Sequence, residues 1–494
     1  MLWQAAATAP ASVAVVERDH PHTYGELYDR ALACAEALAH CGVGPGDRVA
    51  LLLERGVAAA AAFFGAAALG AVTVNVNETL RPRQIEHILS HAGVRVLVTS
   101  GELLSRQPRA IATRAEILDM GTLLRASGSQ SLPLDRVGSD PAQIIYTSGS
   151  TGLPKGVTIS HANLWAGVHA VTSYLQLDGE DRIASLLPFS FDYGFNQLLC
   201  AVYLGATLVV ERAPHPQQIV ATLRAQHVTV LPAVPPLWFQ LLRVEGFRSS
   251  AMPALRLMTN TGGRIPTEAV RALRAAQPQA QLVLMYGLTE AFRSTYLPPA
   301  AVDERPDSIG RAIPGAEILV LRDDLTPCGP GEVGELVHRG PTVALGYWDD
   351  PVATAQVYRP NPLRPPGTPD SERVVFSGDL VRCDEDGFLY HLGRRDKFIK
   401  TLGYRVSPDE VVDVLYASGE LLEAVVVGEL DEQRGERIIA YVVLTTSGSL
   451  SRLQSYARME LPRYMQPARF EVRDSLPRLP SGKHDVAGVA AAAY

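Results

Sequence analysis

The sequence has few cysteines, and they are not arranged as a metal site or a disulfide framework. Five cysteines occur among 494 residues, at positions 34, 41, 200, 328 and 383, and no two form a Cys-x-x-Cys pair. Scattered single cysteines are typical of reduced thiols in a cytosolic protein. We therefore expect a cytoplasmic protein whose fold rests on its apolar core rather than on covalent or metal cross-links.

An excess of positive charge is also missing, because the net charge is −7. Nucleic-acid-binding proteins need a basic surface to contact phosphates, so we expect no nucleic-acid partner. The N-terminal residues lack the basic start of a secretory signal peptide. Residues 56–76 are uncharged and nearly as long as a membrane span, but they are rich in Ala and Gly and end in strand-like alternation. This pattern predicts a buried helix followed by a core strand, and no membrane partner.

Apolar runs that resemble strands alternate with helical patterns over most of the chain. Residues 47–53 and 94–99 are strand-like, whereas residues 216–226 and 267–276 are helical. The alternation predicts an α/β fold of layered, largely parallel sheets, and the length predicts more than one domain. Short strands separated by Pro and Gly turns over residues 309–338 predict a β-rich subdomain.

The C-terminal part of the sequence is separated from the rest by a charged run at residues 394–397, Arg-Arg-Asp-Lys. Such a run suits a linker between domains, although composition alone equally allows a solvated turn. The residues beyond it suffice for one small α/β domain. We predict a large N-terminal domain over residues 1–394 and a small, mobile C-terminal domain over residues 395–494. The Pro-rich residues 359–370 predict an exposed loop.

Residues 146–156 read YTSGSTGLPKG and follow a short apolar strand over residues 143–146. Glycines let the backbone approach a phosphate, successive N–H groups form an anion nest, and hydroxyls and an ammonium complete the coordination. The segment is not a Walker A loop, because Pro154 precedes Lys155. We predict a nucleotide phosphate loop whose ligands are Thr147, Ser148, Gly149, Ser150, Thr151, Gly152 and Lys155.

This loop and six further motifs resemble those of the adenylate-forming superfamily, which includes AMP-forming acyl-CoA synthetases, peptide-synthetase adenylation domains and firefly luciferase. The motifs stand in the family order, and in sequence they are LPFSFD at 187–192, YGLTE at 286–290, SGD at 377–379, GRRD at 393–396, KTLGYRV at 400–406 and PSGK at 480–483. The resemblance covers nearly the whole chain. The sequence is also similar to the AMP-forming acyl ligases associated with exosortase systems, a similarity that does not settle the substrate.

The resemblance implies ATP and Mg²⁺ as cofactors and gives roles to residues that match the motifs. Tyr286 would stack on adenine, Thr289 would approach the α-phosphate, and Glu290 would bind Mg²⁺, which prefers carboxylate oxygen. Asp379 would accept hydrogen bonds from both ribose hydroxyls, with Arg394 nearby. The remaining positions implied for nucleotide binding are Gly262, Gly263 and Gly287.

The resemblance also implies how the C-terminal domain takes part in the reaction. Lys483 would contact the substrate carboxylate and the α-phosphate, where negative charge builds up as pyrophosphate leaves. The family then rotates this domain for transfer to a thiol. Asp396 matches the hinge, Lys400 belongs to the strip that moves in, and Gly403 would border the thiol tunnel, where a side chain would obstruct passage.

Asp192 carries the strongest indication about the acid. In amino-acid-activating relatives an Asp at this place pairs with the substrate α-ammonium, and a carboxylate in an apolar pocket is costly unless it meets a cation. The alternative is a structural Asp that caps the following helix. Arg293 could hold a second carboxylate of the substrate or make a structural ion pair, and the sequence favours neither. The other predicted pocket residues are Phe191, Tyr193, Asn196, Met258, Asn260 and Met285, and they indicate a restricted volume.

Together these features predict an AMP-forming ligase that activates a carboxylic acid, foremost a small amino acid, and transfers it to the phosphopantetheine thiol of a separate carrier protein. An acyl-CoA synthetase that uses free CoA and a non-amino acid is the main alternative. A luciferase-like oxygenase and a non-catalytic nucleotide-binding protein are rivals of other classes. The last predicts loss of a catalytic residue, yet Lys155, Glu290 and Lys483 are all present. The oligomeric state stays open.

Overall fold

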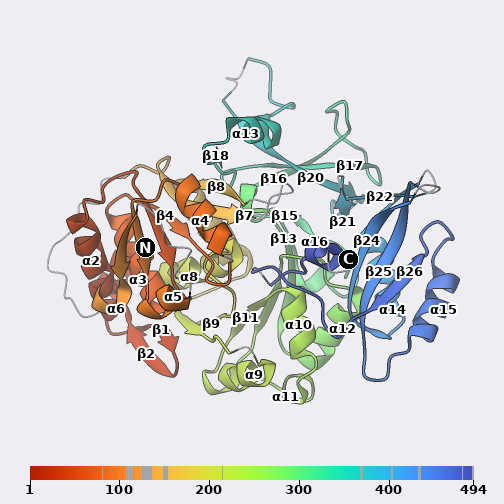
Figure 1. Cartoon of the computed structure of the whole chain (residues 1–494), viewed down its shortest axis with the longest axis horizontal. Helices are drawn as coiled ribbons and strands as arrows, with labels where there is room; N and C mark the ends of the chain where they lie inside the picture. The colour runs from red at the N-terminus through yellow and green to blue at the C-terminus, as the bar shows by residue number, and fades with distance from the viewer. Residues whose placement is uncertain are drawn as a thin grey trace.

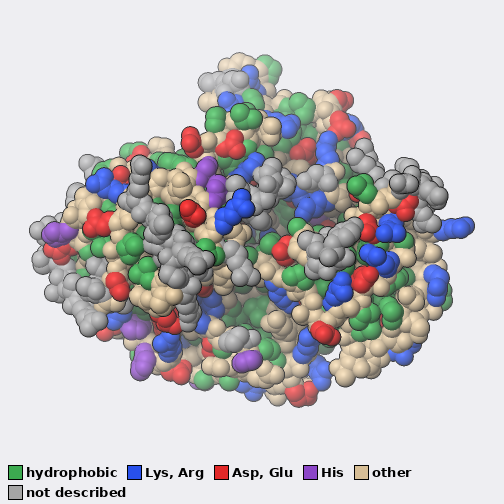
Figure 2. All heavy atoms as spheres, in the orientation of Figure 1, with side chains coloured by type: hydrophobic (Ala, Val, Ile, Leu, Met, Phe, Trp, Pro, Cys, Tyr) green, Lys and Arg blue, Asp and Glu red, His purple; other side chains and the backbone are tan. Residues whose placement is uncertain are grey.

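The computed structural model of the chain shows a mixed α/β molecule with a small C-terminal domain, as the sequence predicts (Figure 1). Charged side chains of both signs are interspersed over the face shown in Figure 2. The residues that the structure describes are 1–80, 82–106, 115–123, 136–147, 154–213, 215–367, 371–395, 397–401, 404–431, 435–480 and 482–491.

The first large sheet has nine strands in the order β15-β14-β13-β12-β11-β9-β10-β1-β2. Its strands from β13 to β1 in this order are parallel, and antiparallel strands close both ends. The strands are β1 (Val13–Glu17), β2 (His20–Thr23), β9 (Arg182–Ser185), β10 (Thr207–Val210), β11 (Val230–Ala233), β12 (Leu257–Asn260), β13 (Gln281–Tyr286), β14 (Thr295–Leu297) and β15 (Arg311–Ala312).

The second large sheet has seven strands in the order β18-β8-β7-β4-β3-β5-β6, and it is parallel from β7 to β6. The near-continuous apolar runs of these inner strands suit a parallel sheet that is covered on both faces. The strands are β3 (Arg48–Leu52), β4 (Val72–Asn75), β5 (Val96–Thr99), β6 (Glu116–Asp119), β7 (Pro141–Thr147), β8 (Lys155–Ser160) and β18 (Gly346–Tyr347).

The largest core cluster lies between these two sheets and is filled by helices. The Ala-rich segment forms a buried helix followed by the core strand β4, which confirms the prediction for residues 56–76. Among the described residues, no helix is long and apolar enough to cross a membrane. The helices of this layer are α1 (Leu2–Thr8), α2 (Tyr24–His40), α3 (Val57–Ala68), α7 (His161–Tyr174) and α8 (Asp192–Leu204).

Further helices cover the outer faces of the sheets. Two core clusters lie there, one under α9 to α12 on the nine-stranded sheet and one under α4 on the seven-stranded sheet. These and the remaining short helices are α4 (Pro82–His91), α5 (Gly101–Arg106), α6 (Met120–Leu123), α9 (Pro216–Ala225), α10 (Pro235–Leu241), α11 (Glu245–Arg248), α12 (Thr267–Ala276), η1 (Thr289–Ala291) and η2 (Pro299–Ala301).

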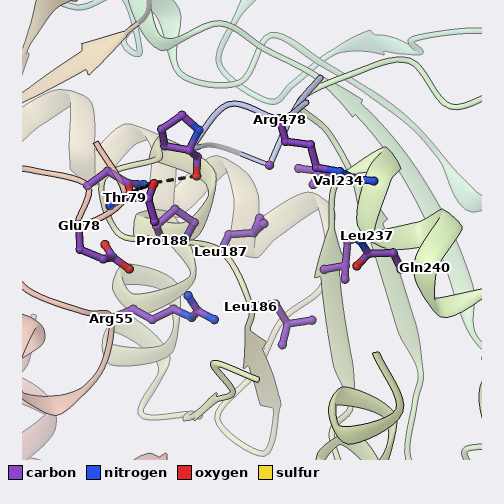
Figure 3. A pocket seen from close by; sticks show the side chains of 13 residues that line it. Arg55, Glu78, Thr79, Leu186, Leu187, Pro188, Val234, Leu237, Gln240 and Arg478 are labelled. Carbon is purple, nitrogen blue, oxygen red and sulfur yellow. Dashed lines mark hydrogen bonds between the residues drawn. The ribbon is translucent and has the colours of Figure 1, made fainter. Parts of the chain in front are cut away.

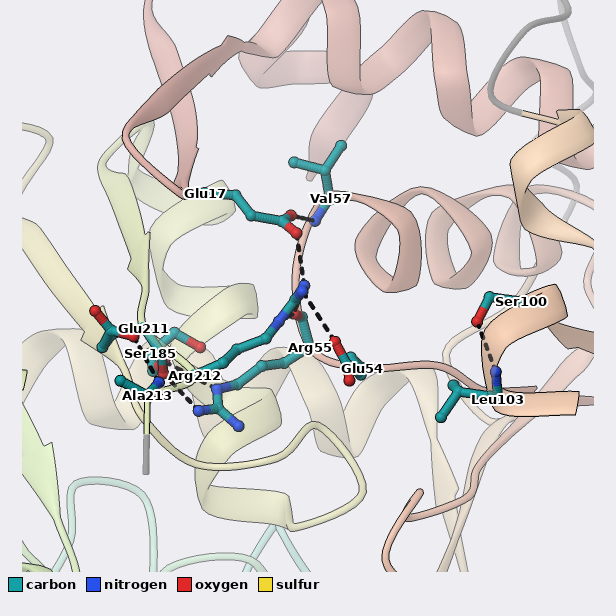
Figure 4. A network of polar contacts seen from close by, with 10 residues as sticks. All are labelled: Glu17, Glu54, Arg55, Val57, Ser100, Leu103, Ser185, Glu211, Arg212 and Ala213. Atoms are coloured by element: carbon teal, nitrogen blue, oxygen red, sulfur yellow. Dashed lines mark hydrogen bonds and ion pairs between the residues drawn. The ribbon is translucent and has the colours of Figure 1, made fainter. Parts of the chain in front are cut away.

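An ion-pair network joins the two large sheets (Figure 4). Arg212, which follows β10, donates to Glu17 at 2.6 Å and to Glu54, which follows β3, at 3.0 Å. Glu17 also accepts a hydrogen bond from the Val57 backbone N–H at 2.9 Å. A carboxylate at this place favours the N-terminus of α3, where no side chain of the preceding Gly56 can cap the helix.

An antiparallel sheet forms the predicted β-rich subdomain, with strand order β16-β17-β20-β19 and β21 paired to β20. The exposed loop predicted for residues 359–370 is wrong at its start, because Arg359 and Pro360 belong to the edge strand β19. An edge strand tolerates proline, which lacks a backbone donor. The elements are β16 (Glu317–Leu321), β17 (Val333–Arg339), β19 (Tyr358–Pro360), β20 (Arg373–Cys383), β21 (Leu389–Arg394) and the helix α13 (Pro351–Val357).

The C-terminal domain has its own core between a five-stranded sheet and two helices, α14 and α15. A division after residue 394 stays a proposal, although β21 ends there and the next strand belongs to a different sheet. The proposed hinge residue Asp396 lies outside the described residues. The elements are β22 (Ile399–Thr401), β23 (Tyr404–Val406), α14 (Pro408–Ala417), β24 (Leu421–Asp431), β25 (Gly435–Leu444), α15 (Leu450–Glu460), β26 (Arg469–Val472) and α16 (Val486–Ala491).

The C-terminal domain packs against the helices that cover the nine-stranded sheet (Figure 1). The rings of Phe239 on α10 and Tyr416 on α14 stack at 5.5 Å. Arg264, which follows β12, pairs with Asp413 of α14 at 2.5 Å. These contacts place the segment that ends at Lys483 against the N-terminal part of the molecule.

Candidate active site

Tyr286 and Asp379 meet at the end of β13 and in the middle of β20. The Tyr286 hydroxyl donates a hydrogen bond to Asp379 Oδ2. Asp379 Oδ1 lies 3.6 Å from Arg394 Nη1 and 3.7 Å from His391 Nε2. Three of the predicted nucleotide-binding residues are therefore neighbours. His391 was not predicted, since it lies outside every motif.

The electrostatics around Asp379 favour its charged form. Burial would raise the pKa of this carboxyl, but His391, Tyr286 and Arg394 together hold the pKa below its usual value. Burial and the same carboxylate raise the pKa of Tyr286 well above its usual range. At neutral pH the pair is a carboxylate next to a neutral phenol, which suits an acceptor of hydroxyl hydrogen bonds.

Tyr347 of β18 contacts both Glu290 and Lys155. The Tyr347 hydroxyl donates to Glu290 Oε1 at 2.6 Å. The ammonium of Lys155 lies 5.5 Å from the centroid of the Tyr347 ring. A cavity of about 140 Å³ opens here, lined by His87, His91, Pro154, Lys155, Gly156, Tyr347, Trp348 and Asp350. Tyr347 was not predicted either.

The phosphate loop connects the paired strands β7 and β8. Thr147 and Lys155 are partners in the ladder of these strands, so both ends of the loop lie next to each other. The other predicted loop residues lie outside the described residues, and they are Ser148, Gly149, Ser150, Thr151 and Gly152. Thr289 begins the short helix η1 that carries Glu290, two residues after Gly287.

The donor set at Glu290 fits Mg²⁺ better than a metal held by the protein alone. Among the described residues, no group of three or more His, Cys, Asp or Glu side chains could hold a metal ion. Mg²⁺ usually keeps several waters and binds through one or two carboxylates together with substrate phosphates. A single carboxylate such as Glu290 suits this mode of binding if the predicted phosphate loop holds ATP.

Lys483 reaches from the C-terminal domain to residues of the N-terminal part. Its ammonium lies 5.4 Å from the centroid of the Phe191 ring. A Cβ at Gly262, where φ is +82°, would lie 3.2 Å from Lys483 Cε, so a side chain there would crowd the lysine. Burial lowers the pKa of Lys483, while Asp192 and Glu290 oppose this effect. Lys483 therefore lies among the charged residues of the predicted site.

A cavity of about 280 Å³ lies beside this lysine, between the two parts of the molecule (Figure 3). Arg55 and Glu78 lie on one side of the cavity and Arg478 on the other. The amide of Asn77 donates to the Pro480 carbonyl at 3.3 Å, which joins the two walls. The remaining lining residues are Thr79, Leu186, Leu187, Pro188, Val234, Leu237, Gln240 and Gly482.

Asp192 is the first residue of α8 and is buried, with 6% of its surface exposed. Its Oδ1 accepts a hydrogen bond from the Tyr193 backbone N–H at 2.7 Å. The N-cap position is Phe191, and no side chain caps this helix. Asp192 is therefore not the N-cap residue itself, but its carboxylate accepts a backbone N–H of the first turn, so both the structural interpretation and the ammonium interpretation remain for this residue.

Tyr193, Met285 and Arg293 lie on the same side of the nine-stranded sheet as Asp192. The Tyr193 hydroxyl donates to the Thr259 carbonyl at 2.9 Å. The guanidinium carbon of Arg293 lies 4.6 Å from the centroid of the Tyr193 ring. Met285 packs in the same core cluster as Tyr193. Asn196, one helical turn after Asp192, accepts a hydrogen bond from the Cys200 thiol at 3.4 Å.

Met258 does not lie with these residues. Its side chain packs into the core cluster on the outer face of the sheet, whereas the next residue, Thr259, contacts Tyr193. Side chains alternate along a strand, so Met258 points away from the pocket side. Asn260 at the end of β12 is 2% exposed, and its Nδ2 donates to the carbonyl of Gly263 at 3.3 Å.

The residues implied for thiol transfer lie mostly beyond the described parts of the chain. Gly403, like the hinge residue Asp396, is outside the described residues. Lys400 belongs to β22, where it pairs with residue 405 of β23. The structure therefore describes the contacts of Tyr286, Asp379 and Lys483, and of the residues implied for thiol transfer it describes Lys400 by its strand pairing.

Comparison with known proteins gives the same family over both parts of the chain. The model of the AMP-binding enzyme family matches residues 2–348, and that of the AMP-binding enzyme C-terminal domain matches residues 410–483. Novobiocin biosynthesis protein H of Streptomyces niveus is 31% identical over 504 residues, which cover 99% of this chain and 81% of that protein.

Two further relatives differ in how much of their own length is matched. A dimodular nonribosomal peptide synthase of Bacillus subtilis is 29% identical over 495 residues, which cover 98% of this chain but 20% of that protein. The other is the o-succinylbenzoate CoA synthetase of Bacillus subtilis, which was solved with its acyl-adenylate intermediate. It superposes with a TM-score of 0.86 at 28% identity, and the match covers 98% of this chain and 96% of the synthetase chain. The same synthetase has been solved with ATP and a magnesium ion.

Proposed function

The chain belongs to the AMP-binding family of adenylate-forming ligases, and on this basis we propose that it activates a small amino acid and transfers it to the phosphopantetheine thiol of a carrier protein. Such ligases use ATP and Mg²⁺ to activate an acid. In the first half-reaction a carboxylate oxygen of the acid bonds to the α-phosphorus of ATP, and the bond to pyrophosphate breaks. In the second the thiol sulfur bonds to the acyl carbon, the thiol loses its proton, and AMP leaves.

The roles proposed for individual residues follow from the contacts of the site. Asp379 accepts the ribose hydroxyls, and Tyr286 leaves its hydrogen bond with Asp379 when its ring stacks on adenine. Lys483 contacts the carboxylate and the α-phosphate, so its charge stabilises the transition state, and its position beside Phe191 supports this role. Bound Mg²⁺ would supply further neutralisation of phosphate charge next to Glu290. The other nucleotide contacts proposed are Thr147, Ser148, Gly149, Ser150, Thr151, Gly152, Lys155, Gly262, Gly263, Gly287, Thr289 and Arg394.

The observation that supports the amino-acid proposal is a carboxylate inside the molecule. Asp192 is buried, and its charge acts on Lys483. An ammonium group is positive and donates three hydrogen bonds, so it would pair with this carboxylate.

One alternative remains for the acceptor, free CoA, and one for the chemistry. The matched peptide synthase supports a carrier protein, and the matched CoA synthetase supports free CoA. The cavity beside Lys483 lies between the two parts of the molecule, where a thiol arm would enter after domain rotation about Asp396 with Gly403 at the tunnel. Emission of light with O₂ consumption would indicate a luciferase-like oxygenase instead.

The amino-acid proposal is tested by exchange of labelled pyrophosphate into ATP across a panel of amino acids and matched acids without an amine. We expect exchange only with acids that carry an α-amine. Asp192→Asn should lower kcat/KM for the best amino acid by about 100-fold, because a buried charge pair loses one partner. Stimulation of the wild-type protein by acids without an amine, at rates equal to the amino acids, would reject the role of Asp192.

A further inference from the structure

Arg293 is a buried cation for which the described residues supply no counter-ion. The residue is 2% exposed, and its Nε and Nη2 atoms are buried without a hydrogen-bond partner in the described parts of the chain. An uncompensated buried charge is costly, and folded proteins rarely retain one without a partner. The missing partner is therefore expected to come from outside the chain.

Aromatic rings flank the guanidinium, but the edge formed by Nε and Nη2 has no hydrogen-bond partner among the described residues. Its central carbon lies 4.6 Å from the ring centroid of Tyr193 and 4.5 Å from that of Phe292. Such contacts stabilise a cation through the ring faces. They do not satisfy the N–H groups, which point outward in the guanidinium plane. This planar fork matches a carboxylate in bidentate geometry.

Arg293 belongs to the acyl site and not to a distant part of the core. It contacts Tyr193, the residue after Asp192 in α8. Its charge also acts on Lys483, whose pKa it helps to lower. Lys483 and Arg293 are positive and Asp192 is negative, and the charges of Arg293 and Asp192 both act on Lys483 at the acyl end of the predicted site.

From this arrangement we infer that the activated acid carries a second anionic group, which Arg293 binds, so that the substrate is an acidic amino acid. The reacting carboxylate meets Lys483, the ammonium meets Asp192, and the second carboxylate meets Arg293. The inference rests on the proposed function and deepens it.

The test is ATP–pyrophosphate exchange with pairs of probes that differ in one charge. L-Aspartate with L-asparagine and L-glutamate with L-glutamine have matched shapes, and succinate and glutarate lack the amine. We expect kcat/KM for at least one acidic amino acid to exceed that for its amide by roughly 100-fold or more, since the amide leaves Arg293 unpaired. Arg293→Met should reduce this ratio to about one, whereas Arg293→Lys should retain part of it.

The outcomes separate this inference from the proposed function. Equal exchange with neutral amino acids, or an acid-to-amide ratio that Arg293→Met leaves unchanged, would overturn the inference and make Arg293 a packing residue only. Exchange with succinate or glutarate at the rate of the amino acids would retain Arg293 and overturn the ammonium site. No exchange with any acid would overturn the proposed function itself. Thermal unfolding and the KM for ATP show whether each variant is folded.

Discussion

Single residues in the interior of the molecule show where charge is tolerated and where it is needed. Asp379 is buried and Lys483 is partly buried, and the charges of side chains in the predicted nucleotide and acyl sites act on both residues. His338 of β17 is different, because it is fully buried between two hydroxyls. Its Nδ1 lies 3.0 Å from Ser294 Oγ and its Nε2 lies 3.0 Å from Thr342 Oγ1. Hydroxyls both donate and accept hydrogen bonds, so it is burial rather than these two neighbours that disfavours the charged ring.

We predict that His338 makes the stability of the protein depend on pH. Burial lowers the pKa of His338 from 6.5 to about 4. Between these values the unfolded chain binds a proton that the folded protein excludes, so stability falls as the pH drops through this window. The loss should reach about 3 kcal/mol at pH 4. Urea unfolding of the wild type and His338→Gln from pH 4 to 7 measures it, and equal slopes in both would contradict the prediction.

The sequence motifs found the residues of the nucleotide site but not all their neighbours. Tyr286 and Asp379 are 93 positions apart in the chain and are hydrogen-bonded in the fold. Their residue types identified them, because the chemistry demands an aromatic ring and a carboxylate. His391 and Tyr347 lie next to Asp379 and Glu290 only because of the fold. A single histidine or tyrosine in a strand belongs to no motif, so the sequence did not identify them. The prediction that Met258 lines the pocket was wrong. The sequence does not show which face of β12 points toward the pocket, and the structure puts Met258 on the other face.

At the level of elements, the buried parallel strands were predictable and the short edge strands were not. The inner strands of both large sheets are continuous apolar runs between helical segments, and the sequence patterns follow them closely. Strands such as β15 and β18 have two residues each, which is too short for any periodic pattern. Strand β19 contains Pro360, which argues against a strand in a sequence pattern, so its pairing with β20 was not predicted.

The small residues of helices α2 and α3 determine how closely the two helices pack. Both are rich in Ala, and they lie side by side in the core between the large sheets. A Cβ at Gly65 of α3 would lie 2.6 Å from the carbonyl oxygen of Ala31 in α2. A backbone oxygen cannot rotate away as a flexible side chain can. The two helices can therefore approach this closely only with glycine at position 65.

We predict that Gly65→Ala destabilises the protein by about 1–3 kcal/mol, because overpacking outweighs the better helix propensity of alanine. Gly246→Ala in α11 is the matched control. A Cβ there would lie 3.6 Å from Val220 Cγ1, an ordinary contact. The midpoint of urea unfolding should fall for Gly65→Ala and stay level or rise for Gly246→Ala. An unchanged or higher midpoint for Gly65→Ala would show that the helices can separate without cost.

At the scale of the whole molecule, the site is complete only when both domains contribute. The contacts of Phe239 with Tyr416 and of Arg264 with Asp413 hold the C-terminal domain where Lys483 faces Phe191 and Gly262. The order of the motifs indicated that both domains belong to one enzyme. The present arrangement of the domains could not be read from the sequence, because the same chain must also allow the rotation proposed for thiol transfer.

The central proposal is that this arrangement of the domains serves the adenylation half-reaction alone. In it Lys483 supplies positive charge to the reacting groups, and rotation of the C-terminal domain then removes it. The most direct measurement compares ATP–pyrophosphate exchange with acyl transfer from supplied acyl-adenylate to CoA or a carrier protein. Lys483→Ala should lower exchange at least about 100-fold, as loss of a group that stabilises transition-state charge does, and leave transfer near the wild-type rate. Arg463→Ala, an exposed cation of the same domain, should leave both rates unchanged. Normal exchange by Lys483→Ala, or equal loss of both half-reactions, would contradict the proposal.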